Sequence, residues 1–366
     1  MHITVESTKL AEALKFSAAP AKSPLDILQF ARLTASDGEL HIETTDTEVY
    51  STVSIPVDIE DEGKLMLHEA TLRSISAGSG ILQMRGDGSV RRGRSHYRVG
   101  VHPSPEDFPD LETVGWSPLE IPATALAEAL AHVGYAPDDK DVRPYCRVVM
   151  VEAGRVWGTD GKVMARRTWN YDTPRFGIPA YQVPRLMDAL SEPEAHVFIG
   201  RVPRVEHIVS LRVSSPGRRF TVRMSDPGTA LNVEKLVPDP DAAGARVRFD
   251  RKALVDALRR FQPFSSWKSE KGMNFLFALE LTSDTVFLSD RAGENVEHLM
   301  EAGAVIEHTG KIRVGLHPKQ MISILGAIRS DQVVLHLAKD VKAAALIQAA
   351  DVPVSEVAHV LMPFTL

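Results

Sequence analysis

Residues 150–160 read MVEAGRVWGTD: a strand-like run, a turn at Ala153-Gly154, a second run and a closing Thr-Asp pair. Two other stretches share this layout, LTASDGELHIETTD at 33–46 and LELTSDTVFLSD at 279–290. Alternating apolar and polar residues on both sides of a short turn predict a β-hairpin. We therefore predict three related hairpins, spaced by about a third of the 366-residue chain.

Amphipathic segments stand before and after each hairpin. The preceding segments are KLAEAL (9–14), ALAEAL (125–130) and ALVDAL (253–258), and the following ones are HEATLRSIS (68–76), VPRLMDAL (183–190) and HPKQMISILGAI (317–328). Apolar residues three to four positions apart are typical of a helix with one buried face. A long repeat of this kind indicates a repeated domain. We predict an α+β chain of three tandem similar domains, each with two helices and antiparallel sheet, at 1–117, 118–243 and 244–366.

Composition and charge limit the class of protein. The chain is 44% hydrophobic and 25% charged, which is typical of a globular protein, and its net charge is −6. It has no apolar run of membrane-spanning length, and its beginning lacks the pattern of a signal peptide. The single cysteine, Cys146, cannot form an internal disulfide and fits a reducing compartment. We expect a cytoplasmic protein that does not bind membranes.

The motifs of common catalytic sites are absent from the sequence. We find no phosphate-binding glycine loop, no GxSxG and no HExxH, and the 13 histidines lack metal-ligand spacing. SSWK at 265–268 matches a short SxxK pattern, but its companion motifs SDN and KTG are missing. The aspartate of each Ser/Thr-Asp pair is predicted to cap a turn by accepting bonds from nearby amides. We predict no catalytic residue, no metal and no cofactor.

Motifs along the whole chain resemble those of one family, the bacterial DNA polymerase III beta subunit or beta sliding clamp. They are MHITVESTKLAEAL (1–14), RRGRSHYRVGVHPSPEDFPDL (91–111), DVRPYC (141–146), GTDGKVMA (158–165), GLHPKQMISIL (315–325) and VLMPFTL (360–366). The resemblance implies the DNA clamp fold, in which two head-to-tail chains form a six-domain ring with helices lining the hole. It implies a non-catalytic processivity factor that encircles duplex DNA without sequence preference and tethers the replicative polymerase.

The resemblance also implies partners and the residues that bind them. The expected partners are a second copy of the chain, the DNA polymerase III alpha subunit, the clamp loader, and other polymerases and repair proteins that carry short clamp-binding peptides. Direct DNA contacts are expected from Lys22, Arg143 and Tyr145. The groove for partner peptides is expected to comprise Cys146, Thr159, Gly161, Lys162, Val163, Met164, Leu231, Lys235, Leu236, His317, Gln320, Val360, Leu361, Met362, Pro363 and Phe364. The dimer interface is expected to include Leu72, Ile75, Phe261 and Phe264.

Basic residues on the predicted helices account for DNA binding by a chain of negative net charge, because their position matters more than the total. They are Lys9, Lys15, Arg73, Arg185, Arg251, Lys252, Arg259, Arg260, Lys319 and Arg329. Three positions depart from the family pattern: Cys146, Gly272 and Thr365. From these departures we predict a groove that prefers a bulkier apolar anchor and depends less on acidic residues of the peptide.

Three other interpretations remain open from the sequence. The chain can be a divergent accessory clamp, carried by a plasmid, a phage or a resistance cluster, with the same ring but fewer partners. It can be a small-molecule enzyme on a triplicated domain, which the missing motifs disfavour, or a monomeric scaffold. Genomic neighbours, a turnover screen and the mass in solution separate these alternatives.

Overall fold

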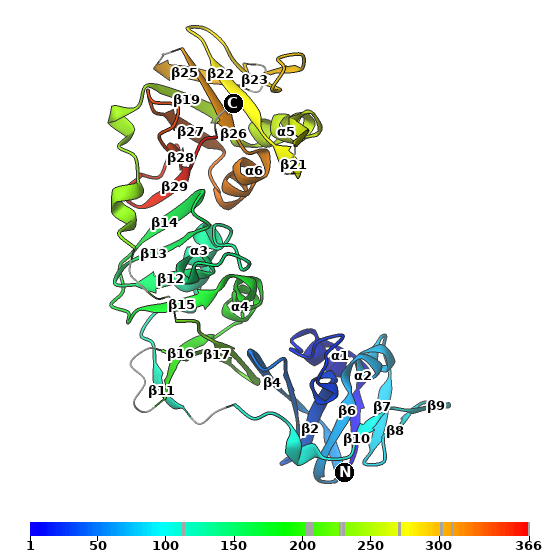
Figure 1. The fold of residues 1–366 in the computed structure, drawn as a ribbon. Coiled ribbons are helices and arrows are strands. Elements are labelled where there is room, and N and C mark those ends of the chain that lie inside the picture. Colours follow the sequence, from blue (N-terminus) through cyan, green and yellow to red (C-terminus); the bar gives the residue numbers. More distant parts are fainter. Residues whose placement is uncertain are drawn as a thin grey trace. The chain divides into compact units, whose positions relative to one another are not determined.

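The protein is described by a computed structural model that covers every residue except 112–113, 203–207, 227, 229–230, 270–271, 301–302, 309–310 and 365–366. It divides into two compact units, Met1–Thr124 with Arg185–Met224, and Ala125–Pro184 with Ser225–Leu366. Six α-helices and many antiparallel strands lie within the described residues, so the predicted α+β class is confirmed (Figure 1).

Each third of the chain contributes two helices. They are α1 (Ser7–Lys15) and α2 (Glu69–Ser76), α3 (Ala123–Val133) and α4 (Val183–Leu190), then α5 (Arg251–Phe261) and α6 (Pro318–Ala327). These are the six helices that the amphipathic segments predicted. The three hairpins are also present, with turns between Ser36 and Glu39, Glu152 and Arg155, and Leu281 and Val286.

Two sheets make up most of the first unit. The smaller has the order β5 (Asp58–Asp61), β1 (His2–Glu6), β7 (Ile81–Arg85), β8 (Ser89–Arg92), β9 (Ser95–Arg98). The larger has nine strands in the order β10 (Val101–His102), β6 (Gly63–His68), β2 (Phe30–Ser36), β3 (Glu39–Thr45), β4 (Val49–Pro56), β18 (Arg218–Arg223), β17 (Ser210–Ser215), β16 (His196–Arg201), β11 (Gly115–Pro118). Strand β4 of the first third thus pairs with β18 of the second.

The second unit repeats this plan. Its nine-stranded sheet has the order β15 (Phe176–Pro179), β12 (Val148–Glu152), β13 (Gly154–Thr159), β14 (Val163–Trp169), β29 (Val357–Leu361), β28 (Ala345–Ala349), β27 (Gln332–Leu337), β19 (Ala245–Asp250), β25 (Val305–His308). A four-stranded sheet has the order β24 (Val296–His298), β23 (Val286–Ser289), β22 (Phe277–Leu281), β26 (Ile312–Leu316), and β20 (Ser266–Ser269) pairs with β21 (Gly272–Phe275). Here β14 pairs with β29 (Figure 1), as β4 pairs with β18 in the first unit.

The pairing across the thirds explains why the two units differ from the three predicted domains. A sheet that continues from β4 into β18, or from β14 into β29, joins neighbouring thirds by backbone hydrogen bonds. The central third is therefore divided between the units. The domain boundaries after 117 and 243 stay a prediction.

The core of the first unit forms where α1 and α2 contact each other and pack against strands of both sheets (Figure 1). Leu10 and Leu14 of α1 and Leu72 of α2 are fully buried in it, together with Ile3 of β1 and Leu82 of β7. Full burial of one such side chain contributes about 1.5–3 kcal/mol. The leucine spacing seen in the sequence therefore corresponds to the face of each helix that packs on the sheets.

Candidate peptide-binding groove

The Thr-Asp turn between β13 and β14 is held by its own side chains. The Thr159 hydroxyl donates to the carbonyl of Val163 at 2.6 Å and accepts from the amide of Gly161 at 2.9 Å. The Asp160 carboxylate accepts from the amides of Lys162 and Val163 at 2.7 and 2.6 Å. The predicted role of Asp160 as a turn cap is confirmed. The cap fixes the start of β14, which forms one wall of a groove.

The first third has the same turn in the same geometry. Thr45 bonds the carbonyl of Val49 and the amide of Thr47, and Asp46 accepts from the amides of Glu48 and Val49. The third copy is longer, and Asp290 accepts there from the Glu294 amide and from the side chain of Asn295. The sequence repeat is therefore also a repeat of hydrogen bonds.

A groove of about 300 Å³ opens beside the Thr159–Asp160 turn, within the second unit. Its lining residues are Arg143, Tyr145, Thr159, Gly161, Lys162, Val163, Met164, Leu231, Lys235, Leu236, Ala344, Val360 and Met362. They come from β14, β29, the 3₁₀-turn Val233–Leu236 and the loop before β12. The structure thus brings together ten of the sixteen predicted groove residues. It adds Ala344, next to β28, which no motif in the sequence indicated.

The end of the chain is part strand and part groove wall. Leu361 is fully buried and pairs with Val163, whereas Met362 is 40% exposed and faces the groove. The Met362 amide donates to the Lys162 carbonyl at 2.7 Å, and the Phe364 amide donates to the Gly315 carbonyl at 2.8 Å. These backbone bonds hold the apolar tail in place, so Met362 can present its side chain without fraying.

Six predicted groove residues do not line this cavity. Pro363 and Phe364 line a neighbouring cavity of about 310 Å³, together with Val341 and Lys342. Leu361 is buried because the alternation of β29 turns it away from the groove, where Val360 points. The remaining three are Cys146, His317 and Gln320.

Cys146 lies in the 3₁₀-turn Pro144–Cys146 and is fully buried behind the groove. Burial raises the pKa of its thiol to about 11, so the thiol stays protonated at neutral pH. It acts as a small hydrophobic residue rather than a nucleophile or a groove contact.

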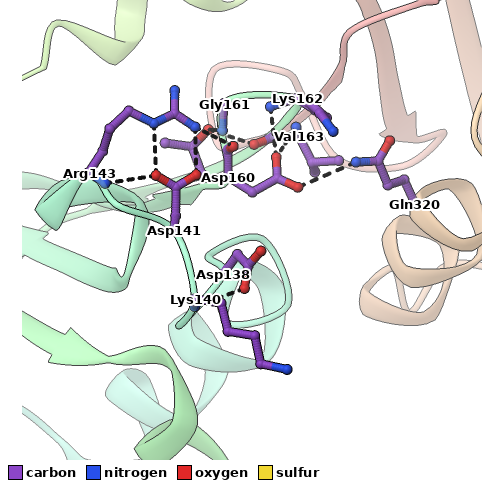
Figure 2. A network of polar contacts seen from close by, with 10 residues as sticks. Asp138, Lys140, Asp141, Arg143, Asp160, Gly161, Lys162, Val163 and Gln320 are labelled. Carbon is purple, nitrogen blue, oxygen red and sulfur yellow. Dashed lines mark hydrogen bonds and ion pairs between the residues drawn. The ribbon is translucent and has the colours of Figure 1, made fainter. Parts of the chain in front are cut away.

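Arg143 is fixed at the edge of the groove by a two-pronged ion pair (Figure 2). Its Nε and Nη2 donate to the two carboxylate oxygens of Asp141 at 2.9 and 2.7 Å, and Nη2 also donates to the Asp160 carbonyl at 2.8 Å. The side-chain bond from Arg143 is the largest cause that lowers the pKa of Asp141, to about 2. Gly161 has φ +82°, and a Cβ there would lie 2.6 Å from the Arg143 guanidinium. The glycine therefore leaves room for this arginine.

The turn is also tied to α6. Gln320 Nε2 donates to the second carboxylate oxygen of Asp160 at 3.3 Å (Figure 2). His317 precedes α6, and its ring lies 6.3 Å from that of Phe364. Burial lowers the pKa of His317, with Lys162 as the next cause. Gln320 and His317 therefore support the groove from behind instead of lining it.

The predicted DNA contacts lie in different settings. Lys22 is exposed in the loop after α1, whereas Arg143 and Tyr145 both line the groove. Of the ten basic helix residues, nine are exposed and Arg251 is half-buried. Five of the ten form ion pairs with a neighbouring acid: Lys9, Arg73, Arg185, Arg260 and Arg329.

The predicted dimer residues are mostly internal. Leu72, Ile75 and Phe261 are buried within the single chain, and Phe264 is 52% exposed. Of these four, only Phe264 offers a large apolar surface to a second chain.

Among the departures from the family pattern, Gly272 pairs with Ser269 in the β20–β21 hairpin, and Thr365 lies outside the described residues.

In the described part of the chain, no group of three or more His, Cys, Asp or Glu residues could hold a metal ion. No described helix is long and apolar enough to cross a membrane.

Comparison with known proteins shows sequence similarity to beta sliding clamps. No family model matches the chain. The beta sliding clamp of Streptomyces coelicolor is 30% identical over 159 residues, which span 42% of each protein. That of Micrococcus luteus is 25% identical over 276 residues, which cover 71% of this chain and 87% of the relative.

Solved structures match over the full length. A sliding clamp from Bartonella birtlesii, bound to griselimycin, has a TM-score of 0.84 at 21% identity, with complete coverage of both chains. A sliding clamp from Pseudomonas aeruginosa has a TM-score of 0.82 at 21% identity, also with complete coverage. The chain therefore has the fold of the DNA sliding clamps. Within that class it is similar to the bacterial DNA polymerase III beta subunit, and the resemblance found in the sequence is confirmed.

Proposed function

We propose that this protein is a DNA sliding clamp that encircles duplex DNA and tethers a replicative polymerase. The observation that carries the proposal is the apolar groove of about 300 Å³, found in a chain with the clamp fold and lined by the tail that the sequence singled out. The curated relatives, named beta sliding clamps, support it further. They favour the clamp over the accessory paralogue, the enzyme and the monomeric scaffold.

The groove is proposed to bind a short partner peptide. Met164 and Val360, which pair across β14 and β29, provide an apolar floor, and Met362 and Leu236 are exposed at its sides. Methionine suits a site with several partners because its side chain is flexible and polarizable. The expected occupants are peptides of a polymerase, a clamp loader and repair proteins, and the preference for a bulky anchor stays a prediction.

A head-to-tail dimer is proposed to close the ring. Strand β9 is an edge strand whose four residues are all exposed, and Arg94 and Arg98 make this edge basic. Strand β24 is also an edge strand, where Val296 is 46% exposed and Glu297 is paired with Arg260 of α5. An exposed edge readily pairs with another strand. We propose that β9 of one chain pairs with β24 of the other, with Phe264 contributing apolar contact.

The clamp is proposed to act without catalysis, since a closed ring stays on DNA by topology and needs no tight or sequence-specific contact. The deciding experiment loads the protein on nicked circular DNA with a clamp loader and measures retention during gel filtration. Retention on the circle and loss after linearisation are expected. Equal retention on linear DNA contradicts encirclement.

Calorimetry with a short apolar-anchored clamp-binding peptide tests the groove. Replacing Met362 with Glu places a charge on the apolar wall and is expected to weaken peptide binding at least tenfold. The matched control is Leu25→Glu, since Leu25 is also exposed but lies in the first unit. Unchanged affinity in Met362→Glu would remove the tail from the site.

A further inference from the structure

A second cavity lies where β4 meets β18, at the positions that correspond to the groove. Its volume is about 280 Å³, and it lies entirely within the first unit. In the groove, Met164 of β14 pairs with Val360 of β29. In the second cavity, Tyr50 of β4 pairs with Thr221 of β18. Tyr50 and Met164 each lie four residues after the aspartate of a Thr-Asp turn. The two cavities therefore lie at equivalent strand junctions of the repeat.

The chemistry of the two cavities is opposite. Following the strand pairings outward from these two pairs gives the equivalent positions of the two units. Arg32 corresponds to Met150, Glu43 to Trp157, Arg212 to Leu346 and Arg219 to Ala358. Met150 and Trp157 are buried against Leu231, and Leu346 and Ala358 are buried with Met164 and Val360. Four apolar positions that pack beside the groove are thus charged in the first unit. This second cavity is therefore unsuited to the apolar anchor proposed for the groove.

One of the three arginines is already neutralised. Arg32 donates to Glu43 at 2.8 and 3.1 Å and to Asp110 at 2.6 Å, and it lies over the ring of Phe108 at 4.5 Å. Both carboxylates of the cavity are therefore occupied by Arg32.

The other two arginines of the cavity, Arg212 and Arg219, are held differently. The Arg212 guanidinium stacks on Trp116 at 3.7 Å, and its Nε donates to the Thr221 hydroxyl at 3.2 Å. Among the described residues, no carboxylate forms an ion pair with Arg212 or Arg219. Burial lowers the pKa of Arg212 to about 10, with the charge of Arg219 as the second cause. Arg212 remains charged at neutral pH, in a setting that favours an added anion.

We propose that this cavity is an oxyanion site, in which Arg212 and Arg219 bind a carboxylate or phosphate group. Guanidinium groups bind such anions through paired N–H donors, and Tyr50, Thr52 and Thr221 place hydroxyl groups around the same cavity. The volume of about 280 Å³ lies just below the usual range of ligand pockets, which is about 300–1,000 Å³. The ligand is therefore small: a free phosphate, or one acidic side chain. This proposal stands apart from the function of the groove.

Calorimetry at fixed ionic strength tests the site with two probes, inorganic phosphate and N-acetyl-aspartic acid α-amide, which keeps its side-chain carboxylate. The neutral amide of N-acetyl-asparagine is the control ligand. We expect saturable binding of one anion per chain, and the stronger probe identifies the source as free phosphate or peptide carboxylate. No saturable binding of either anion overturns the proposal.

Arg219→Gln is expected to weaken binding at least tenfold and to leave folding intact, since Arg219 is exposed and makes no ion pair with a described residue. Arg212→Gln is expected to have the same effect, with thermal melting as its fold check. The matched control is Arg218→Gln, the adjacent residue, whose side chain is paired with Glu192 and stacks on Phe16. Equal losses in Arg218→Gln and Arg219→Gln would show a general charge effect and reject the site.

Discussion

At the scale of single residues, hydrogen bonds within one turn determine the surface that the turn presents. Thr159 and Asp160 satisfy the turn internally, and the same turn then holds Arg143 through the Asp160 carbonyl. Because Asp141 compensates the charge of Arg143, this arginine is better suited to shaping the groove than to contacting DNA phosphates.

Two glycines of similar conformation allow a test of this arrangement. Gly154 and Gly161 have φ +85° and +82°, but only at Gly161 would a Cβ meet Arg143. Alanine at either position should cost about 1–2 kcal/mol of folding free energy, because positive φ is unfavourable for other residues. Only Gly161→Ala should displace Arg143 and raise the pKa of Asp141 from about 2, measured by carboxyl NMR of aspartate-labelled protein. An unchanged Asp141 pKa in this variant would contradict the proposed packing.

The burial of His359 is expected to make the free energy of unfolding depend on pH. It is buried on β29, its Nδ1 lies 2.9 Å from the Tyr135 hydroxyl, and burial lowers its pKa to about 3. The unfolded chain binds a proton near pH 6.5, so the stability contributed by neutral His359 is present above that pH. It should be lost as the pH falls toward 3, by up to about 1.4 kcal/mol per pH unit.

Urea unfolding at pH 7.5, 6 and 5 measures this slope. His359→Gln should flatten the slope, although other buried histidines keep part of it. The control His96→Gln, at an exposed position of β9, should leave it unchanged. Equal slopes in wild type and His359→Gln would show that His359 does not titrate as described.

At the scale of elements, buried residues of a helix stabilise the fold, whereas exposed residues beside a helix are available to bind a second chain. Leu72 of α2 is fully buried in the core, whereas Phe264, just after α5, is half-exposed. The interface predicted from sequence combined both kinds of residue. The structure assigns Leu72 to the core and leaves Phe264 available.

Two alanine variants should therefore behave differently. Leu72→Ala should cost about 2–5 kcal/mol of stability, because it leaves a cavity in the core. Phe264→Ala should leave the stability of the monomer nearly unchanged and weaken the proposed dimer. Urea unfolding and sedimentation velocity across a dilution series measure the two effects. A Phe264→Ala dimer as strong as wild type would place the interface elsewhere.

At the scale of the whole molecule, the proposed DNA binding depends on the position of the basic residues more than on the net charge. Five of the ten helix cations are paired with acids, and Lys22 is exposed on a loop. Weak, sequence-independent binding that depends on salt is expected for a proposed ring of this kind.

The salt dependence of binding to linear duplex DNA tests the contributions of single residues. Lys22→Ala should reduce the slope of log affinity against log salt by about one, as for a lost phosphate contact. Arg143→Ala should reduce it less, because Asp141 already pairs with Arg143. The control Lys64→Ala changes an exposed lysine on β6 and should have no effect. A larger change in Arg143→Ala than in Lys22→Ala would restore Arg143 as a main DNA contact.

Local periodicity and turn chemistry in the sequence predict the six helices, the three hairpins and the capping role of Asp160. The groove residues, in contrast, were expected from the resemblance to the clamp family. Tertiary packing determined the burial of particular residues that the resemblance had placed in a binding surface. It turned Leu361 and Cys146 inward, placed Leu72 in the core and brought Arg143 to the groove. It also set Arg212 and Arg219 side by side at the first junction, where the sequence shows only scattered arginines. Such contacts join residues far apart in the chain through sheet pairing, and no local pattern encodes them.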